Sequence, residues 1–94
     1  MAKRLGSRLF INKLSYFTTR HELKTLFSQF GVVKDAKVIR DPKTLRSKGF
    51  GFVTFETESE AQKAMKAMNG RFVRARMMFV EFANDRSPEI DSDS

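Results

Sequence analysis

The stretch Lys48-Gly49-Phe50-Gly51-Phe52-Val53-Thr54-Phe55 decides the fold, because it is the strongest strand pattern in the chain. Successive side chains of a strand point to opposite faces of a sheet. If Val53 and Phe55 face a core, Phe50 and Phe52 face the other way. Burying a phenylalanine side chain is worth about 1.5 to 3 kcal/mol, so two of them on an open face indicate a binding surface.

A helix is predicted on each side of this strand, because the same start signal and apolar period occur twice. Thr19 with Glu22, and Thr57 with Glu60, each form the pattern of a capping box. Apolar residues then recur at helical spacing until a glycine stops the pattern. The predicted buried stripes are Leu23, Leu26, Phe27 and Phe30 in the first helix and Ala61, Ala64, Met65 and Met68 in the second.

Three further strands are predicted, at residues 8–14, 32–40 and 76–83, with a basic loop at 41–47. The order β-α-β-β-α-β is the split βαβ arrangement. Right-handed crossovers place both helices on the same side of the sheet. The sequence therefore predicts an α+β, ferredoxin-like fold, in which a four-stranded antiparallel sheet carries two helices on one face and leaves the other bare.

Length and charge predict the domain organisation. The 94 residues are enough for one small domain with a net charge of +7. One of the 18 basic residues and four of the 11 acidic residues lie in 84–94, so residues 1–83 carry 17 minus 7, or +10. We predict a basic N-terminal tail at 1–7, a domain at 8–83 and an acidic, disordered tail at 84–94. So basic a domain attracts nucleic acid or an anionic membrane surface.

The composition argues against several classes of site. The absence of cysteine excludes a disulfide and a thiolate zinc site, and the single histidine, His21, cannot assemble a metal cluster and is predicted to be a solvated helix residue. The sequence contains no paired carboxylates, no nucleophile with an adjacent base and no glycine loop that cradles phosphate. No apolar run is long enough to span a membrane. We therefore predict no enzyme activity, no cofactor, no metal and no membrane partner.

The bare face has the spacing of a platform for splayed bases. Alternation in the first strand turns Phe10 outward as well, and Phe50 and Phe52 lie about 6.6 Å apart along their strand. Single-stranded bases stack on such rings with about 1 to 3 kcal/mol each. Surrounding lysines and arginines attract phosphates.

The octamer at 48–55 resembles the RNA-recognition motif family at every position of the pattern K/R-G-F/Y-G/A-F-V-x-F/Y. The segment Leu9-Phe10-Ile11-Asn12-Lys13-Leu14 is similar to the family's hexamer, apart from Lys13, which stands where asparagine is usual. The likeness covers about residues 8–83. It implies that Phe10, Phe50 and Phe52 contact bases and that Lys48 meets the phosphate backbone.

The glycines at 49 and 51 are interpreted as positions where a side chain would stand on the closely packed helix side. A plain strand irregularity is the alternative.

The remaining candidates surround these rings. The predicted phosphate contacts are Lys48, Lys13, Arg46, Lys43, Arg74 and Arg76. Weaker candidates for the RNA surface are Phe79, Lys37, Ile39, Glu81 and Asn12. For Phe79, a cover provided by the C-terminal segment is an equal alternative, and that acidic tail is a hypothetical weak competitor of RNA.

Other functions stay open. Single-stranded DNA also stacks on phenylalanine, so the preference for RNA comes from the family. A protein-binding relative would use the helical face, and small acyl-phosphate hydrolases share the topology. We predict a monomer that takes part in RNA processing or stability. The compartment is not encoded: nucleus, cytoplasm, mitochondrion and plastid all remain.

Overall fold

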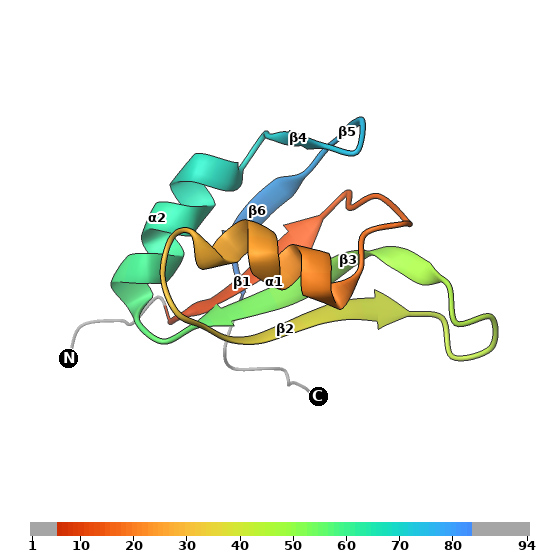
Figure 1. Ribbon diagram of the computed structural model, residues 1–94, viewed down its shortest axis with the longest axis horizontal. Helices are drawn as coiled ribbons and strands as arrows, with labels where there is room; N and C mark the ends of the chain where they lie inside the picture. Colours follow the sequence, from red (N-terminus) through yellow and green to blue (C-terminus); the bar gives the residue numbers. More distant parts are fainter. Residues whose placement is uncertain (1–5, 84–94) are drawn as a thin grey trace.

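The computed structural model describes residues 6–83, and its elements follow the predicted order (Figure 1). The strands of the main sheet are β1 (Arg8–Asn12), β2 (Val33–Arg40), β3 (Ser47–Phe55) and β6 (Phe79–Phe82). The helices are α1 (Arg20–Ser28) and α2 (Glu58–Met68). A separate hairpin consists of β4 (Phe72–Val73) and β5 (Arg76–Met77).

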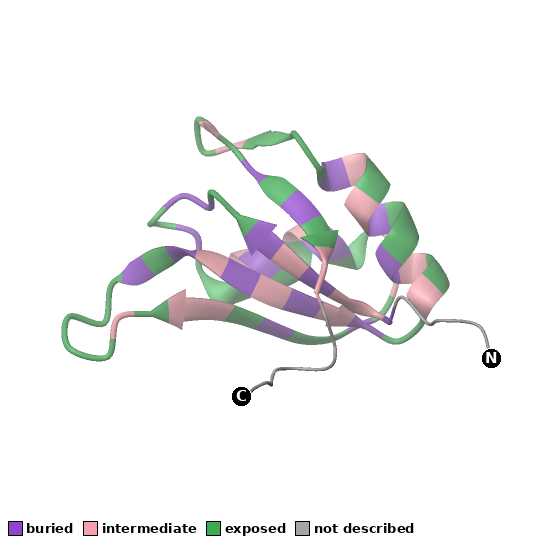
Figure 2. Ribbon diagram, turned by 180° about the vertical axis from the view of Figure 1, so that it is seen from behind, coloured by how far each residue is buried: buried purple, intermediate pink, exposed green. Residues whose placement is uncertain are grey.

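The main sheet has the strand order β2-β3-β1-β6, and each neighbouring pair is antiparallel. Both helices lie on the same face of this sheet (Figure 1), and no helix or strand of residues 6–83 lies on the opposite face (Figure 2). The predicted α+β, ferredoxin-like architecture is therefore confirmed.

The two helices begin at the predicted threonines, but by different sets of hydrogen bonds. In α2, Thr57 Oγ1 accepts from the Glu60 N–H, and Glu60 accepts from the Thr57 N–H, so the capping box is complete. In α1, Thr19 Oγ1 accepts from the Glu22 N–H. The Glu22 carboxylate instead accepts from Nε of Arg74, at 2.9 and 3.0 Å. The prediction of a full box at α1 was wrong, because a charged donor is a stronger partner than a backbone N–H.

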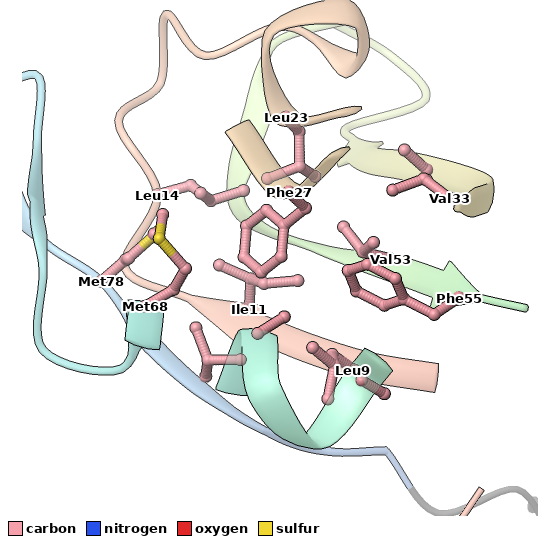
Figure 3. Close-up of a cluster of buried hydrophobic side chains, with 14 residues drawn as sticks. Leu9, Ile11, Leu14, Leu23, Phe27, Val33, Val53, Phe55, Met68 and Met78 are labelled. Carbon is pink, nitrogen blue, oxygen red and sulfur yellow. The ribbon is translucent and has the colours of Figure 1, made fainter. Parts of the chain in front are cut away.

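The core lies between the helices and the inner face of the sheet (Figure 3). Leu9 and Ile11 of β1 are fully buried, as is Phe55 of β3, whose ring lies 6.4 Å from that of Phe27 on α1. Alternation along β1 and β3 then turns the residues between them toward the bare face. The predicted helical stripes are confirmed: Leu23, Phe27, Ala61, Ala64 and Met68 are buried, and Leu26, Phe30 and Met65 are half-buried against the core.

The last strand is shorter than predicted. Arg76 and Met77 pair with the strand β4 and not with β1. At the turn between β4 and β5, Arg74 and Ala75 have φ values of 54° and 67°, the left-handed backbone of a tight two-residue hairpin. Such turns usually contain asparagine or glycine. Because Arg74 and Ala75 are neither, the sequence did not predict this hairpin.

Side chains of the last strand nevertheless alternate between the core and the bare face. Met78 and Val80 are buried, whereas Phe79 and Glu81 are exposed. The strand begins three residues later and ends one residue earlier than predicted.

Candidate nucleic-acid interface

Three phenylalanine rings form a cluster on the bare face of the sheet. Phe10 of β1 lies opposite Phe52 of β3, and its ring centroid is 5.4 Å from that of Phe52 and 5.7 Å from that of Phe50. The rings are tilted by 48° and 54°, within the favoured range for aromatic pairs. All three are half-buried, and Figure 2 shows β1 and β3 alternating between buried and half-buried residues. The three rings therefore contact one another through Phe10 and remain partly exposed.

The strand register places oppositely charged residues on either side of this ring cluster (Phe10, Phe50 and Phe52). Lys37 of β2 lies opposite Phe52, and Glu81 of β6 lies opposite Phe10. Directly opposed residues of an antiparallel pair share a face. A row therefore crosses the face from a cation through two rings to a carboxylate.

A second row contains Phe50, Asn12 and Phe79, which the registers of β3, β1 and β6 place side by side. The Phe79 side chain is 47% exposed, so the described residues leave about half of it open. Asn12, Phe79 and Glu81 line a shallow hollow of about 340 Å³. The acidic tail at 84–94, the alternative cover for Phe79, lies outside the described residues.

Ile39 is half-buried on β2, next to a register shift between Val38 and Arg40. Val38, and not Ile39, packs against the core.

Arg8 also belongs to this face, and the sequence reasoning did not single it out. Its guanidinium carbon Cζ lies 4.2 Å from the centroid of the Phe52 ring. A guanidinium so placed makes a cation–π contact worth about 0.5 to 1 kcal/mol at an exposed site. Its position two residues before Phe10 was the available signal, since residues i and i+2 of a strand share a face.

The basic loop between β2 and β3 is held by Asp41. The Asp41 Oδ1 accepts from the backbone N–H groups of Lys43, at 2.8 Å, and Thr44, at 3.2 Å. These two hydrogen bonds, the first the stronger, hold the pKa of Asp41 below its usual value of 3.8. Lys43 and Arg46 are exposed on this loop, and Lys48 is exposed on the adjoining end of β3. All three are open to a phosphate.

The two arginines before the last strand differ in their availability. Arg74 donates to both carboxylate oxygens of Glu22, and this hydrogen bonding raises the pKa of its guanidinium. Arg76 lies with Cζ 5.4 Å from the ring centroid of Tyr16. Arg74 therefore already has an anionic partner, whereas the contact of the Arg76 guanidinium within residues 6–83 is with an aromatic ring.

The glycines of the octamer have causes other than close helix packing. Gly49 has a φ of 84°, which only glycine adopts at no steric cost. At Gly51 a Cβ would collide with the carbonyl oxygen of Lys37 on β2. The neighbouring strand, not a helix, excludes a side chain there.

Lys13 adopts a left-handed backbone, with φ of 63°, and its N–H donates to Asn12 Oδ1 at 2.9 Å. Asparagine tolerates this region better than lysine. The usual asparagine at this place in the hexamer therefore fits the turn after β1. Lys13 is exposed there, at the end of the strand that carries Phe10.

Within residues 6–83, no group of three or more histidine and acidic side chains is arranged to hold a metal ion. Of the helices described, neither has the length and apolarity needed to cross a membrane. His21 is exposed on α1.

Comparison with known proteins gives a consistent picture. A family model described as RNA recognition motif matches residues 9–79. Small RNA-binding protein 11, chloroplastic, of Arabidopsis thaliana is 46% identical over 79 residues, which are 84% of this chain and 54% of the relative. Glycine-rich RNA-binding protein 4, mitochondrial, of the same plant is 43% identical over 83 residues, or 88% of this chain and 61% of the relative.

A solved Sex-lethal protein/RNA complex superposes with a TM-score of 0.83 at 34% identity, and the match covers 88% of this chain and 50% of that one. The chain spans 26 to 61% of the length of the curated relatives that it matches.

Proposed function

The chain belongs to the RNA recognition motif family, a family of RNA-binding domains and not of enzymes, and from this premise we propose that it binds single-stranded RNA. Bases stack on Phe10, Phe50 and Phe52, and cations at the rim of the sheet contact phosphates. The domain of residues 8–83 is the binding unit and acts as a monomer in RNA processing or stability.

The observation that carries this proposal is the ring cluster on a sheet face that no helix or strand of the described residues covers. Its centroids lie 5.4 and 5.7 Å apart, so a single nucleotide strand meets several rings at once. Spacing between strands exceeds base stacking in a duplex, so the bases must be splayed. The family's preference for RNA favours RNA over single-stranded DNA, which offers the same stacking.

The site is small, and this limits its affinity. One such sheet covers roughly two to four nucleotides, so micromolar affinity is expected from the domain by itself. In this proposal Lys37, Lys48 and Arg46 attract phosphates, whereas Glu81 and Asn12 meet base edges. The position of Lys37 opposite Phe52 and that of Glu81 opposite Phe10 support these roles.

The test is a fluorescence anisotropy titration with pooled single-stranded RNA, matched DNA and duplex RNA. Replacing Phe50 and Phe52 together by alanine removes two stacks and weakens single-stranded binding by at least about thirtyfold. Phe72→Ala is the matched control, because this ring is 67% exposed on the β4–β5 hairpin and off the sheet face. Equal binding by the double variant and the control would reject the stacking mechanism.

A salt series separates RNA from a protein ligand. The logarithm of the affinity falls with the logarithm of salt concentration at about 0.7 per phosphate contact for a single strand. A flat dependence would point to a protein that docks on the sheet or on the helical face, the main rival function.

A further inference from the structure

Basic side chains gather on the helical side of the sheet, where α1 lies against β2 (Figure 1). They surround a small hollow of about 140 Å³, which shares no lining residue with the ring cluster. Its lining combines one face of α1 with the beginning of β2 and consists of Arg20, His21, Lys24, Lys34, Asp35 and Ala36. This α1–β2 hollow is therefore a polar site distinct from the rings.

The cations of the α1–β2 hollow are not neutralised by neighbouring side chains. Arg20, Lys24 and Lys34 are exposed, and none of them forms an ion pair with another side chain of residues 6–83. Asp35 is the one acidic residue of the lining, so the charges sum to 3 minus 1, or +2, with His21 neutral. A hollow with this excess of positive charge attracts an anion.

The placement of two of these cations works against the stability of α1. Arg20 and Lys24 lie one turn apart on the helix, and like charges at this spacing repel each other. Arg20 is also the first residue of α1, where a positive charge is unfavourable in the field of the helix macrodipole. An anion held between the cations offsets both effects, so the folded chain is stabilised by binding one.

The size of the α1–β2 hollow limits what it holds. Pockets for drug-sized ligands measure about 300 to 1,000 Å³, so 140 Å³ suits a group of a few heavy atoms, such as one phosphate. Arginine and lysine bind phosphate oxygens by charge-assisted hydrogen bonds. Neither phenylalanine nor tyrosine lines the hollow, so it offers a base no ring of the kind found on the bare face.

The position of β2 connects this hollow with the bare face. β2 lies at one edge of the main sheet, with Lys37 opposite Phe52 and Lys34 three residues before Lys37. A nucleic-acid strand that leaves Phe52 past Lys37 therefore rounds the edge of the sheet without crossing another strand. Because the cations continue from the ring cluster to the hollow, a phosphate of the same nucleic acid fits this site better than an acidic protein does.

We propose that the α1–β2 hollow binds one backbone phosphate of the RNA whose bases stack on the ring cluster, so that longer RNA wraps round the β2 edge onto α1. This proposal rests on the proposed function. Arg20 and Lys24 contact the phosphate from the helix, and Lys34 contacts it from the strand. Phosphate contacts carry no sequence information, so the hollow adds affinity and salt dependence but no choice of base.

The test compares random-sequence single-stranded RNA of three and of twelve nucleotides by fluorescence anisotropy over a salt series. The hollow variant combines Arg20→Gln, Lys24→Gln and Lys34→Gln. The matched control combines Lys63→Gln, Lys66→Gln and Arg71→Gln, which are exposed positions on α2 or just after it. Both variants lower the net charge from +7 to +4, so a difference between them reports the site and not the total charge. Glutamine keeps the helix propensity of the residues it replaces.

For twelve-nucleotide RNA, the hollow variant lowers the salt slope by about 0.7 relative to the control, the contribution of one phosphate contact. Over the roughly 1.3 decades between 50 mM and 1 M salt, this slope amounts to about an eightfold loss of affinity at 50 mM. The trinucleotide, which the ring cluster accommodates, binds both variants equally. This equality also shows that the hollow variant is folded.

Equal binding of twelve-nucleotide RNA by the hollow variant and the control would overturn the proposal and leave the cations to an acidic protein. An equal loss for both RNA lengths would overturn it as well, because the three cations would then act on the RNA at the rings and not beyond them. The Phe50→Ala, Phe52→Ala variant separates these failures from that of the proposed function, because only the latter leaves trinucleotide binding insensitive to the loss of both rings.

Discussion

Replacing Phe10 by alanine tests whether the ring cluster is one coupled unit. Phe10 contacts both other rings, whereas Phe50 and Phe52 each contact Phe10. An aromatic pair contributes about 0.5 to 1.5 kcal/mol beyond the area that it buries. Phe10→Ala therefore removes two pairs, about 1 to 3 kcal/mol, and Phe50→Ala removes one. Phe52→Ala removes one pair and the Arg8 contact, which is worth about 0.5 to 1 kcal/mol more.

We expect the loss of unfolding free energy to rank Phe10→Ala above Phe52→Ala, and Phe52→Ala above Phe50→Ala. All three rings are half-buried, so the area terms are similar. Urea unfolding followed by far-ultraviolet circular dichroism measures this rank, because the chain has no tryptophan to report by fluorescence. A loss for Phe10→Ala no larger than that for Phe50→Ala, at equal denaturant slope, would refute the coupling of the rings.

Further predictions concern the backbone around the site. Gly51→Ala lowers the free energy of unfolding by about 3 kcal/mol, the upper end for overpacking, because the new Cβ meets the Lys37 carbonyl of the paired strand. Gly70→Ala lowers it by about 1 kcal/mol, because Gly70 has a φ of 85° but lies in open space. The reverse rank in urea unfolding would contradict these expectations. Lys13→Asn raises the free energy of unfolding by about 0.5 to 1 kcal/mol, because asparagine tolerates the left-handed backbone at this position better than lysine does. A decrease would show that the backbone of Lys13 is not strained. Asp41 has a lowered pKa in the folded chain, so its contribution to the loop is present above pH 3.8 and is lost as pH falls through the folded value. The NMR signals of the two amides that it accepts from should move together with a midpoint below pH 3.8, and a midpoint above it would reverse the sign.

Most of the fold was predictable because the deciding signals are local. Capping threonines and apolar stripes located both helices, and alternation in 48–55 oriented the central strand. Two features escaped prediction for different reasons. Glu22 is drawn from its capping box by Arg74, 52 residues away, and a pattern read along the chain does not contain that contact. The β4–β5 hairpin is local, but its turn uses left-handed arginine and alanine instead of the usual turn residues.

The same distinction holds for the site. The predicted phenylalanines of β1 and β3 lie together because alternation alone puts them on one face. Arg8 was within reach of that reasoning, two residues from Phe10. The cations of the α1–β2 hollow were not, because Arg20 and Lys24 meet Lys34 only through the packing of α1 on β2. A helix and a strand have different periods, so only the three-dimensional arrangement joins these residues.

The positive and negative charges of the bare face lie on different sides of the rings, so attraction of phosphates and selection of bases involve different strands. Lys37 lies on the β2 side of Phe52 and Lys48 lies at the end of β3, whereas Glu81 lies on the β6 side of Phe10. A carboxylate repels phosphate but accepts hydrogen bonds from base amino groups. Bound RNA should therefore run its phosphates over β2 and β3 and turn base edges toward β6. If the proposed function is right, we expect substitutions on the β2 and β3 side to change the salt dependence of RNA affinity and substitution of Glu81 to change the choice of base, while the rings stay intact.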